Sequence, residues 1–119
     1  MKLVGLIITT VFLGATVAEA AEVKLQSLQV QSKLKAGKPY RVKVKYSATG
    51  EVDLSKACFL WSGEGPFCFS GFSDEKGVIS LKLRTNNPGR YKLEGYIQYV
   101  GGGQFKNSNK VAKTIRVRR

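Results

Sequence analysis

The residues with the most distinctive chemistry lie together in the segment 58–72. It contains both cysteines, the only tryptophan and four of the six phenylalanines. If this segment folds as an antiparallel hairpin about Gly63, Cys58 lies directly opposite Cys68. Because side chains alternate across a strand, both cysteines then share one face. Four aromatic residues share the other face: Phe59, Trp61, Phe67 and Phe69. One face of the hairpin can therefore be joined covalently while the other packs.

The cysteine pair supports different chemistry in different compartments. In a reducing cytosol, Cys58 and Cys68 would indicate a free thiol pair or half of a metal site. Outside the cytosol, the simplest interpretation is a disulfide. On the chain-entropy model, closing so short a loop stabilises the fold by about 2.5 kcal/mol.

The N-terminal segment favours the second case. Residues 1–20 have a short positive region with Lys2, an uncharged and mostly apolar run over 3–17, and an Ala-Glu-Ala site at 18–20. This pattern is typical of a signal peptide cleaved after Ala20, and the run is too short for a membrane span of about 20 residues. We therefore expect one exported domain over residues 21–119, without a transmembrane segment. It would be periplasmic or secreted, and a bacterial envelope protein fits best.

Catalysis and cofactors have little support in the sequence. The chain has no histidine, which removes histidine-based triads, histidine metal ligands and the commonest general base near neutral pH. Oxidised cysteines would leave no soft metal ligands. The acidic residues have no recognisable catalytic spacing, and no glycine-rich phosphate loop is present. The sequence predicts no catalytic residue, no metal and no cofactor; a small hydrolase is the minority alternative.

The elements that would position the hairpin are strands. Tyr40, Val42, Val44 and Tyr46 alternate strictly with polar residues, and no segment keeps a helical period. A change of phase near Ser27 predicts a bulge or a strand that changes sheets, and Lys113 predicts an edge position or a bulge. About seven strands with regular turns indicate a sandwich or a small barrel.

Three local features resemble immunoglobulin-like domains. The run 87–91, NPGRY, resembles the signature of the tyrosine corner, in which the tyrosine hydroxyl bonds back to the preceding turn. Trp61 falls on the third strand, where that family keeps a core tryptophan, and the segment 34–44 is similar to the first hairpin of bacterial exported immunoglobulin-like and fibronectin type III-like domains. The resemblance implies an all-β, seven-stranded antiparallel sandwich with strand order A-B-E against C′-C-F-G and no strand D.

The resemblance also assigns the aromatic face of the hairpin. It implies that the aromatic residues point inward and that the disulfide lies on the outer face, with a structural core that includes Phe59, Trp61, Phe67 and Tyr91. Neither cysteine is where antibody-type domains keep their inter-sheet disulfide. The alternative is an exposed aromatic platform that stacks on sugars or receives a partner strand.

Two surfaces are candidate binding sites. The first is the tip of the hairpin, a tethered loop of small residues with one acid, whose simpler interpretation is a tight turn. It comprises Ser62, Gly63, Glu64, Gly65 and Pro66. The second, which we call the basic face, is a set of cations in phase on two strands expected to be neighbours. It comprises Arg41, Lys43, Lys45, Lys82 and Arg84.

The net charge suggests the class of partner. Lys2 and Glu19 cancel, so residues 21–119 keep the net charge of +12. Such an excess favours an anionic partner, although a solvated basic surface would also explain it. Without aromatics interleaved among the cations, nucleic acid is disfavoured. We expect a non-enzymatic binding module that contacts an anionic envelope polymer or another protein; the alternative is a secreted inhibitor or effector that inserts the loop 62–66 into an enzyme.

Overall fold

The computed structural model describes residues 21–119, so the signal peptide predicted for residues 1–20 lies outside the described residues. The described chain forms strands joined by turns, and none of its residues belongs to a helix that could cross a membrane. The strands are β1 (Glu22–Gln29), β2 (Lys33–Lys35), β3 (Pro39–Thr49), β4 (Val52–Trp61), β5 (Glu64–Phe69), β6 (Ser73–Glu75), β7 (Val78–Arg84), β8 (Gly89–Gly101), β9 (Gln104–Asn107) and β10 (Val111–Arg118).

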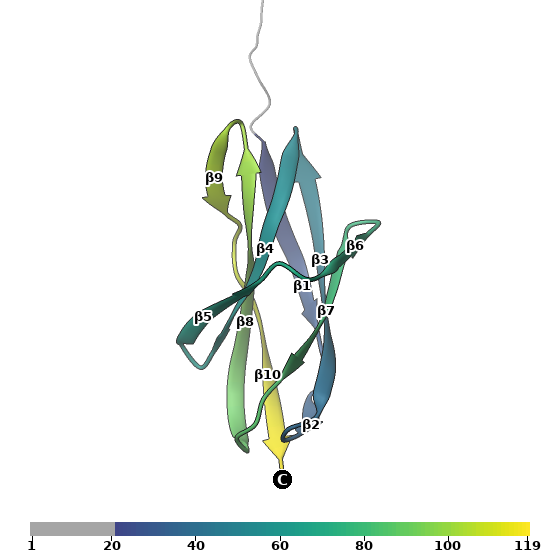
Figure 1. The fold of residues 1–119 in the computed structure, drawn as a ribbon, viewed down its shortest axis with the longest axis vertical. Helices are drawn as coiled ribbons and strands as arrows, with labels where there is room; N and C mark the ends of the chain where they lie inside the picture. The colour runs from purple at the N-terminus through teal and green to yellow at the C-terminus, as the bar shows by residue number, and fades with distance from the viewer. Residues whose placement is uncertain (1–20) are drawn as a thin grey trace, which may run out of the picture.

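These strands form two sheets that enclose one core. The first has the order β1-β3-β7-β6, and the second has the order β2-β10-β8-β4-β5, with β9 paired to β8. In Figure 1 the sheets run along an elongated sandwich, with β5 and β6 projecting on opposite sides. The long strands reproduce the predicted order, because β1-β3-β7 corresponds to A-B-E and β5-β4-β8-β10 to C′-C-F-G.

Alternation explains which side of each strand is buried. In β3, Tyr40, Val42 and Val44 are buried while the residues between them are exposed. β-Branched and aromatic residues suit such a half-buried strand. The largest fully buried side chains come from both sheets: Phe59, Ile79, Leu93, Ile97 and Ile115. The core is therefore the interface between the two sheets.

Three short strands were not expected from the sequence. β6 pairs with β7 and occupies the strand D position that the resemblance left empty. β2 crosses to the second sheet, where it pairs parallel with the end of β10. β9 is separate from β10 and pairs with β8. Such short strands carry little alternation, so their partners decide their conformation.

Both predicted irregularities have a structural cause. The register of β1 against β3 shifts between Leu25 and Ser27, which is the expected bulge. At Lys113, β10 is at the sheet edge, because β2 pairs with it only from Arg116 onward. The Lys113 ammonium group donates to the carbonyl oxygen of Val30 at 2.5 Å, so the cation is tied to the backbone that leaves β1.

The tyrosine corner is present. Tyr91 Oη donates to the carbonyl oxygen of Asn87 at 2.8 Å, across a turn in which Gly89 has φ +150°. This bond fixes the entry into β8, the strand that pairs with both β4 and β10.

A second tyrosine holds β6 against the sandwich. Tyr46 Oη lies 2.8 Å from both carboxylate oxygens of Asp74 on β6. Burial of the phenol, and then the hydrogen bond and the charge of Asp74, raise the pKa of Tyr46 to about 12. A raised pKa means that folding favours the protonated phenol.

This contact predicts a pH dependence of stability. The stabilisation from Tyr46 is complete below its ordinary pKa of 10.0 and is lost as the pH rises through about 12. Tyr46→Phe should lower the free energy of unfolding by about 1 kcal/mol at pH 8. It should also show a shallower decline between pH 10 and 12 in urea unfolding. Asp74→Asn, which keeps an acceptor but removes the charge, is the control. Parallel pH profiles for the wild type and Tyr46→Phe would contradict the assignment.

Candidate functional site

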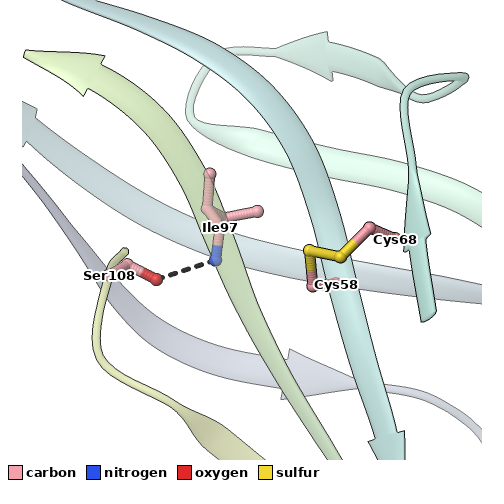
Figure 2. The surroundings of a disulfide bond; sticks show 4 residues. All are labelled: Cys58, Cys68, Ile97 and Ser108. Atoms are coloured by element: carbon pink, nitrogen blue, oxygen red, sulfur yellow. Dashed lines mark hydrogen bonds between the residues drawn. A yellow bond between two sulfur atoms is a disulfide. The ribbon is translucent and has the colours of Figure 1, made fainter. Parts of the chain in front are cut away.

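The hairpin predicted about Gly63 forms with Cys58 opposite Cys68 and Phe59 opposite Phe67, and its register departs from the prediction only at the tip. Cys58 on β4 and Cys68 on β5 are joined by a disulfide between directly opposed residues, with Cα atoms 4.0 Å apart. Figure 2 shows the bond bridging the two neighbouring strands. Cys58 is fully buried yet lies outside the core cluster, because it pairs with the buried Tyr96 of β8 on the outer side of the sheet.

The aromatic face of the hairpin divides into a buried and an exposed part. Phe59 is fully buried in the core, and Trp61 and Tyr91 are partly buried against it. The prediction that Phe67 belongs to the core is wrong, because its side chain is 52% exposed and that of Phe69 is 36% exposed. β5 is the edge of its sheet and contacts mainly β4, and Phe69 borders a hollow whose other side is formed by Pro39 of β3 and Lys82 of β7.

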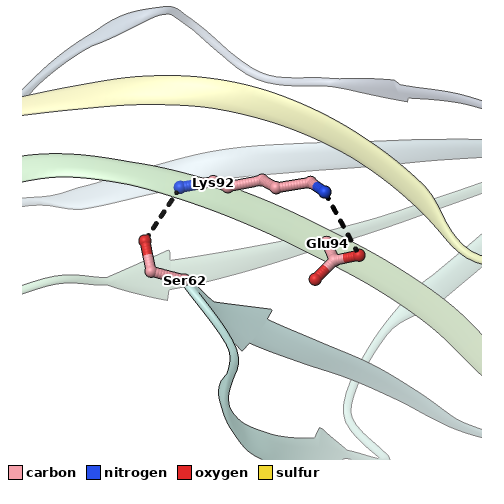
Figure 3. Close-up of polar contacts among 3 residues, drawn as sticks. All are labelled: Ser62, Lys92 and Glu94. Carbon is pink, nitrogen blue, oxygen red and sulfur yellow. Dashed lines mark hydrogen bonds and ion pairs between the residues drawn. The ribbon is translucent and has the colours of Figure 1, made fainter.

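The hairpin tip is partly committed to the fold. Ser62 donates its backbone N–H to the carbonyl oxygen of Lys92, and its Oγ accepts the Lys92 backbone N–H at 3.1 Å. Figure 3 shows the hydroxyl contact, together with the 4.0 Å ion pair between Lys92 and Glu94. Beyond Ser62 the register shifts, so that Trp61 lies opposite Glu64. Ser62 therefore anchors the tip to β8, and residues 63–66 remain exposed.

The residues of the basic face are all exposed on the outer side of the first sheet. Their strands β3 and β7 are neighbours, and Arg41 lies directly opposite Lys82. Arg41 donates to the Ser80 hydroxyl at 2.7 Å. A shallow hollow on this face is lined by Arg41, Lys43 and also by Glu75 of β6, so one acid moderates the charge there.

The structure adds a larger cationic surface that the sequence did not reveal. A groove of about 560 Å³ opens where β2, the start of β3 and the end of β10 meet, and among the described residues no acid lines it. We call this the cationic groove. Its cations are Lys33, Lys35, Lys38, Arg41, Arg118 and Arg119. The alternation of cations around Leu34 and Val117 was visible in the sequence, but the parallel pairing that brings them together was not.

A second hollow lies beside the hairpin. We call it the aromatic pocket, and it holds about 330 Å³ between β5 and the turn from β7 to β8. Its aromatic and charged lining comprises Trp61, Phe67, Phe69, Tyr91, Glu64 and Arg84. It thus unites residues predicted separately for the core, the hairpin tip and the basic face.

The described part of the chain has no cluster of metal-binding side chains. Among residues 21–119, no three His, Cys, Asp or Glu side chains gather in a group that could hold a metal ion.

Comparison with known proteins identifies the architecture. No family model and no curated protein matches the sequence. Among solved structures, the chain is similar to a PKD domain of an M14-like peptidase from a Thermoplasmatales archaeon, with a TM-score of 0.52 and 7% identity over 85% of this chain and 98% of that one. It is also similar to a CARDB domain from Pyrococcus furiosus, solved in complex with di-metal ions, with a TM-score of 0.53 and 17% identity over 86% of this chain and 97% of that one. The fold is immunoglobulin-like. At these identities the likeness concerns the fold alone.

Within this immunoglobulin-like sandwich, the candidate surfaces lie next to one another. Pro39 and Arg41 line the cationic groove, and Pro39 also lines a hollow with Lys82, Arg84 and Trp61. That hollow shares Trp61, Phe69 and Arg84 with the aromatic pocket. The cationic groove and the aromatic pocket are therefore joined into one continuous surface by Arg41, Lys82 and Arg84 of the basic face.

Loss of the disulfide should loosen the part of the site on β5. We expect the double variant Cys58→Ala, Cys68→Ala to be less stable by about 2.5 kcal/mol, because the unfolded chain is no longer constrained. Urea unfolding followed by Trp61 fluorescence measures this loss. Dithiothreitol should destabilise the wild type similarly and leave the double variant unchanged. Equal stability of the wild type and the double variant would show that the tether contributes nothing.

Proposed function

We propose that this protein is an exported, non-enzymatic binding module of the cell envelope or secreted fraction, which binds an anionic polymer. The polymer lies in the cationic groove and extends over the basic face. The observation that carries the proposal is the shared position of Arg41, which lines both the groove and the hollow on the basic face. One anionic chain can therefore contact both surfaces.

The parallel pairing of β2 with β10 places like charges side by side. In the parallel pair, Lys33 lies beside Arg116 and Lys35 beside Arg118. Like charges on adjacent strands repel, so this arrangement is unfavourable unless solvent or a partner offsets it. An anionic polymer would offset the repulsion at several positions at once.

The excess charge has almost no internal compensation. Among residues 21–119 the single ion pair is Lys92–Glu94, at 4.0 Å and with an exposed ammonium group. Exposed pairs of this kind contribute little to stability. The net charge of +12 is thus available to attract anions and to accelerate their association, an effect that salt screens.

Two observations support export. Residues 1–20 have the pattern of a cleavable leader. The Cys58–Cys68 disulfide is of a kind that persists in oxidising compartments and is rare in the cytosol.

The alternative of an inhibitor that inserts the loop 62–66 has less support. Ser62 is tied to Lys92 by two hydrogen bonds, and Glu64 lines the aromatic pocket. The tip therefore contributes to a neighbouring surface.

Charge reversal tests the proposal with inorganic polyphosphate as the probe. A groove variant, Lys33→Glu, Lys35→Glu, Arg118→Glu, should raise the Kd by roughly tenfold or more at low salt, because it removes direct contacts. A control variant reverses three exposed lysines elsewhere, Lys56, Lys76 and Lys110, to Glu. Each variant lowers the net charge from +12 to +6, since each reversal changes it by two.

Isothermal titration calorimetry at two salt concentrations measures both variants, after circular dichroism has shown that they are folded. We expect the control to bind several-fold more tightly than the groove variant. A third variant, Lys43→Glu, Lys45→Glu, Lys82→Glu, tests whether the polymer extends over the basic face. Equal weakening by the groove and control variants would mean that net charge alone attracts the polymer, and would overturn the proposal.

A further inference from the structure

Two phenylalanine rings of the aromatic pocket are exposed to solvent instead of being buried in the core. Phe67 is 52% exposed, and its ring meets that of Trp61 edge-on with centroids 5.6 Å apart. Phe69 lies on the same strand, two residues along, and also faces the pocket. Grouped exposed aromatics on a small soluble domain commonly mark a binding site.

The pocket is held in place before any ligand arrives. Trp61 Nε1–H donates to Tyr40 Oη at 3.3 Å, and Tyr40 Oη lies 2.7 Å from Thr85 Oγ1. Tyr91 is fixed by its corner bond, and Cys68 tethers β5 between Phe67 and Phe69. A pocket fixed in this way loses little conformational freedom on binding.

Polar side chains around the rings have unused hydrogen-bonding capacity. Glu64, Arg84, Asn86 and Asn87 line the pocket, and within residues 21–119 their side chains form no hydrogen bond or ion pair with the protein. The amides and the carboxylate can bind hydroxyl groups, and the guanidinium can bind a carboxylate through two parallel bonds. The combination suits a ring that carries both hydroxyl and carboxylate groups.

The pocket continues into the cationic surface. Arg84 also lines the adjoining hollow with Lys82 and Pro39, and Pro39 reaches the cationic groove. A chain with a ring in the pocket could therefore place further anionic groups along these cations.

From these contacts we infer that the aromatic pocket binds a sugar ring of an acidic polysaccharide, a polymer of uronic acids. The C–H face of the ring lies on the aromatic rings, whose faces are negative, and its carboxylate pairs with Arg84. The inference rests on the proposed function, because it names the class of anionic polymer. Nucleic acid fits less well, since a DNA strand offers no hydroxyl groups along its length to the Glu64 carboxylate and the Asn86 and Asn87 amides.

Phe67→Ala tests the inference, and Phe105→Ala is its matched control. Phe105 lies on β9 and is 82% exposed, so both substitutions remove an exposed phenyl ring and should leave the fold intact. The probes are a mannuronate hexamer, inorganic polyphosphate and the single-stranded oligonucleotide dT10. Trp61 is the only tryptophan, so its fluorescence reports on the pocket directly, and calorimetry gives Kd.

We expect the mannuronate hexamer to change Trp61 emission and Phe67→Ala to raise its Kd about fivefold to tenfold. Polyphosphate, which has no ring, should bind Phe67→Ala as it binds the wild type, and Phe105→Ala should change neither Kd. If polyphosphate binds but Phe67→Ala leaves mannuronate binding unchanged, the sugar site is wrong and the proposed function stands. If dT10 binds more tightly than mannuronate and loses affinity in Phe67→Ala, the occupant is nucleic acid and the inference is overturned. If no polyanion binds, both proposals fail.

Discussion

Burial of one side of each long strand is the constraint on which the rest of the structure depends. Val42 and Val44 of β3 belong to the same core cluster as Phe59 and Leu93 of the opposite sheet, and each buried apolar side chain contributes about 1.5–3 kcal/mol. A shift of one residue would bury the lysines of β3 instead of the valines. The same packing that holds the sandwich together therefore places the cations of the neighbouring strands β3 and β7 on its outer side.

Where the two sheets cease to face each other, side chains acquire other neighbours. β5 extends as a sheet edge, so Phe67 is largely exposed beside the turn before β8, while Phe69 keeps a ring contact with the core residue Phe59. β2 reaches the opposite edge of that sheet and brings its lysines beside the arginines of β10. The cationic groove and the aromatic pocket thus both belong to the periphery of the sandwich, and the disulfide tethers the edge strand β5 to β4.

The two surfaces differ in what they can recognise. The cationic groove offers charge without an ordered set of hydrogen-bonding groups, which supports affinity and fast association more than selectivity. The aromatic pocket offers shaped apolar contact with a few polar groups of both signs, which is the usual composition of a selective site. Pro39, Lys82 and Arg84 connect them, so charge can hold a polymer near the surface while the pocket selects among its residues.

Local pattern was enough to determine much of this protein. The strand phases, the Cys58–Cys68 pairing, the bulge near Ser27 and the Tyr91 corner all follow from neighbours a few residues apart along the chain, where alternation and turn chemistry act directly. Only the tertiary structure decided that Phe67 is exposed, that Ser62 is an anchor, that β6 is a strand and that β2 joins β10. Those outcomes depend on how far the opposite sheet extends and on partners distant in sequence, and neither quantity is written in the local pattern. The alternation of β3 thus predicted that its cations face outward, while the fold decided which other cations and which aromatic rings they would meet.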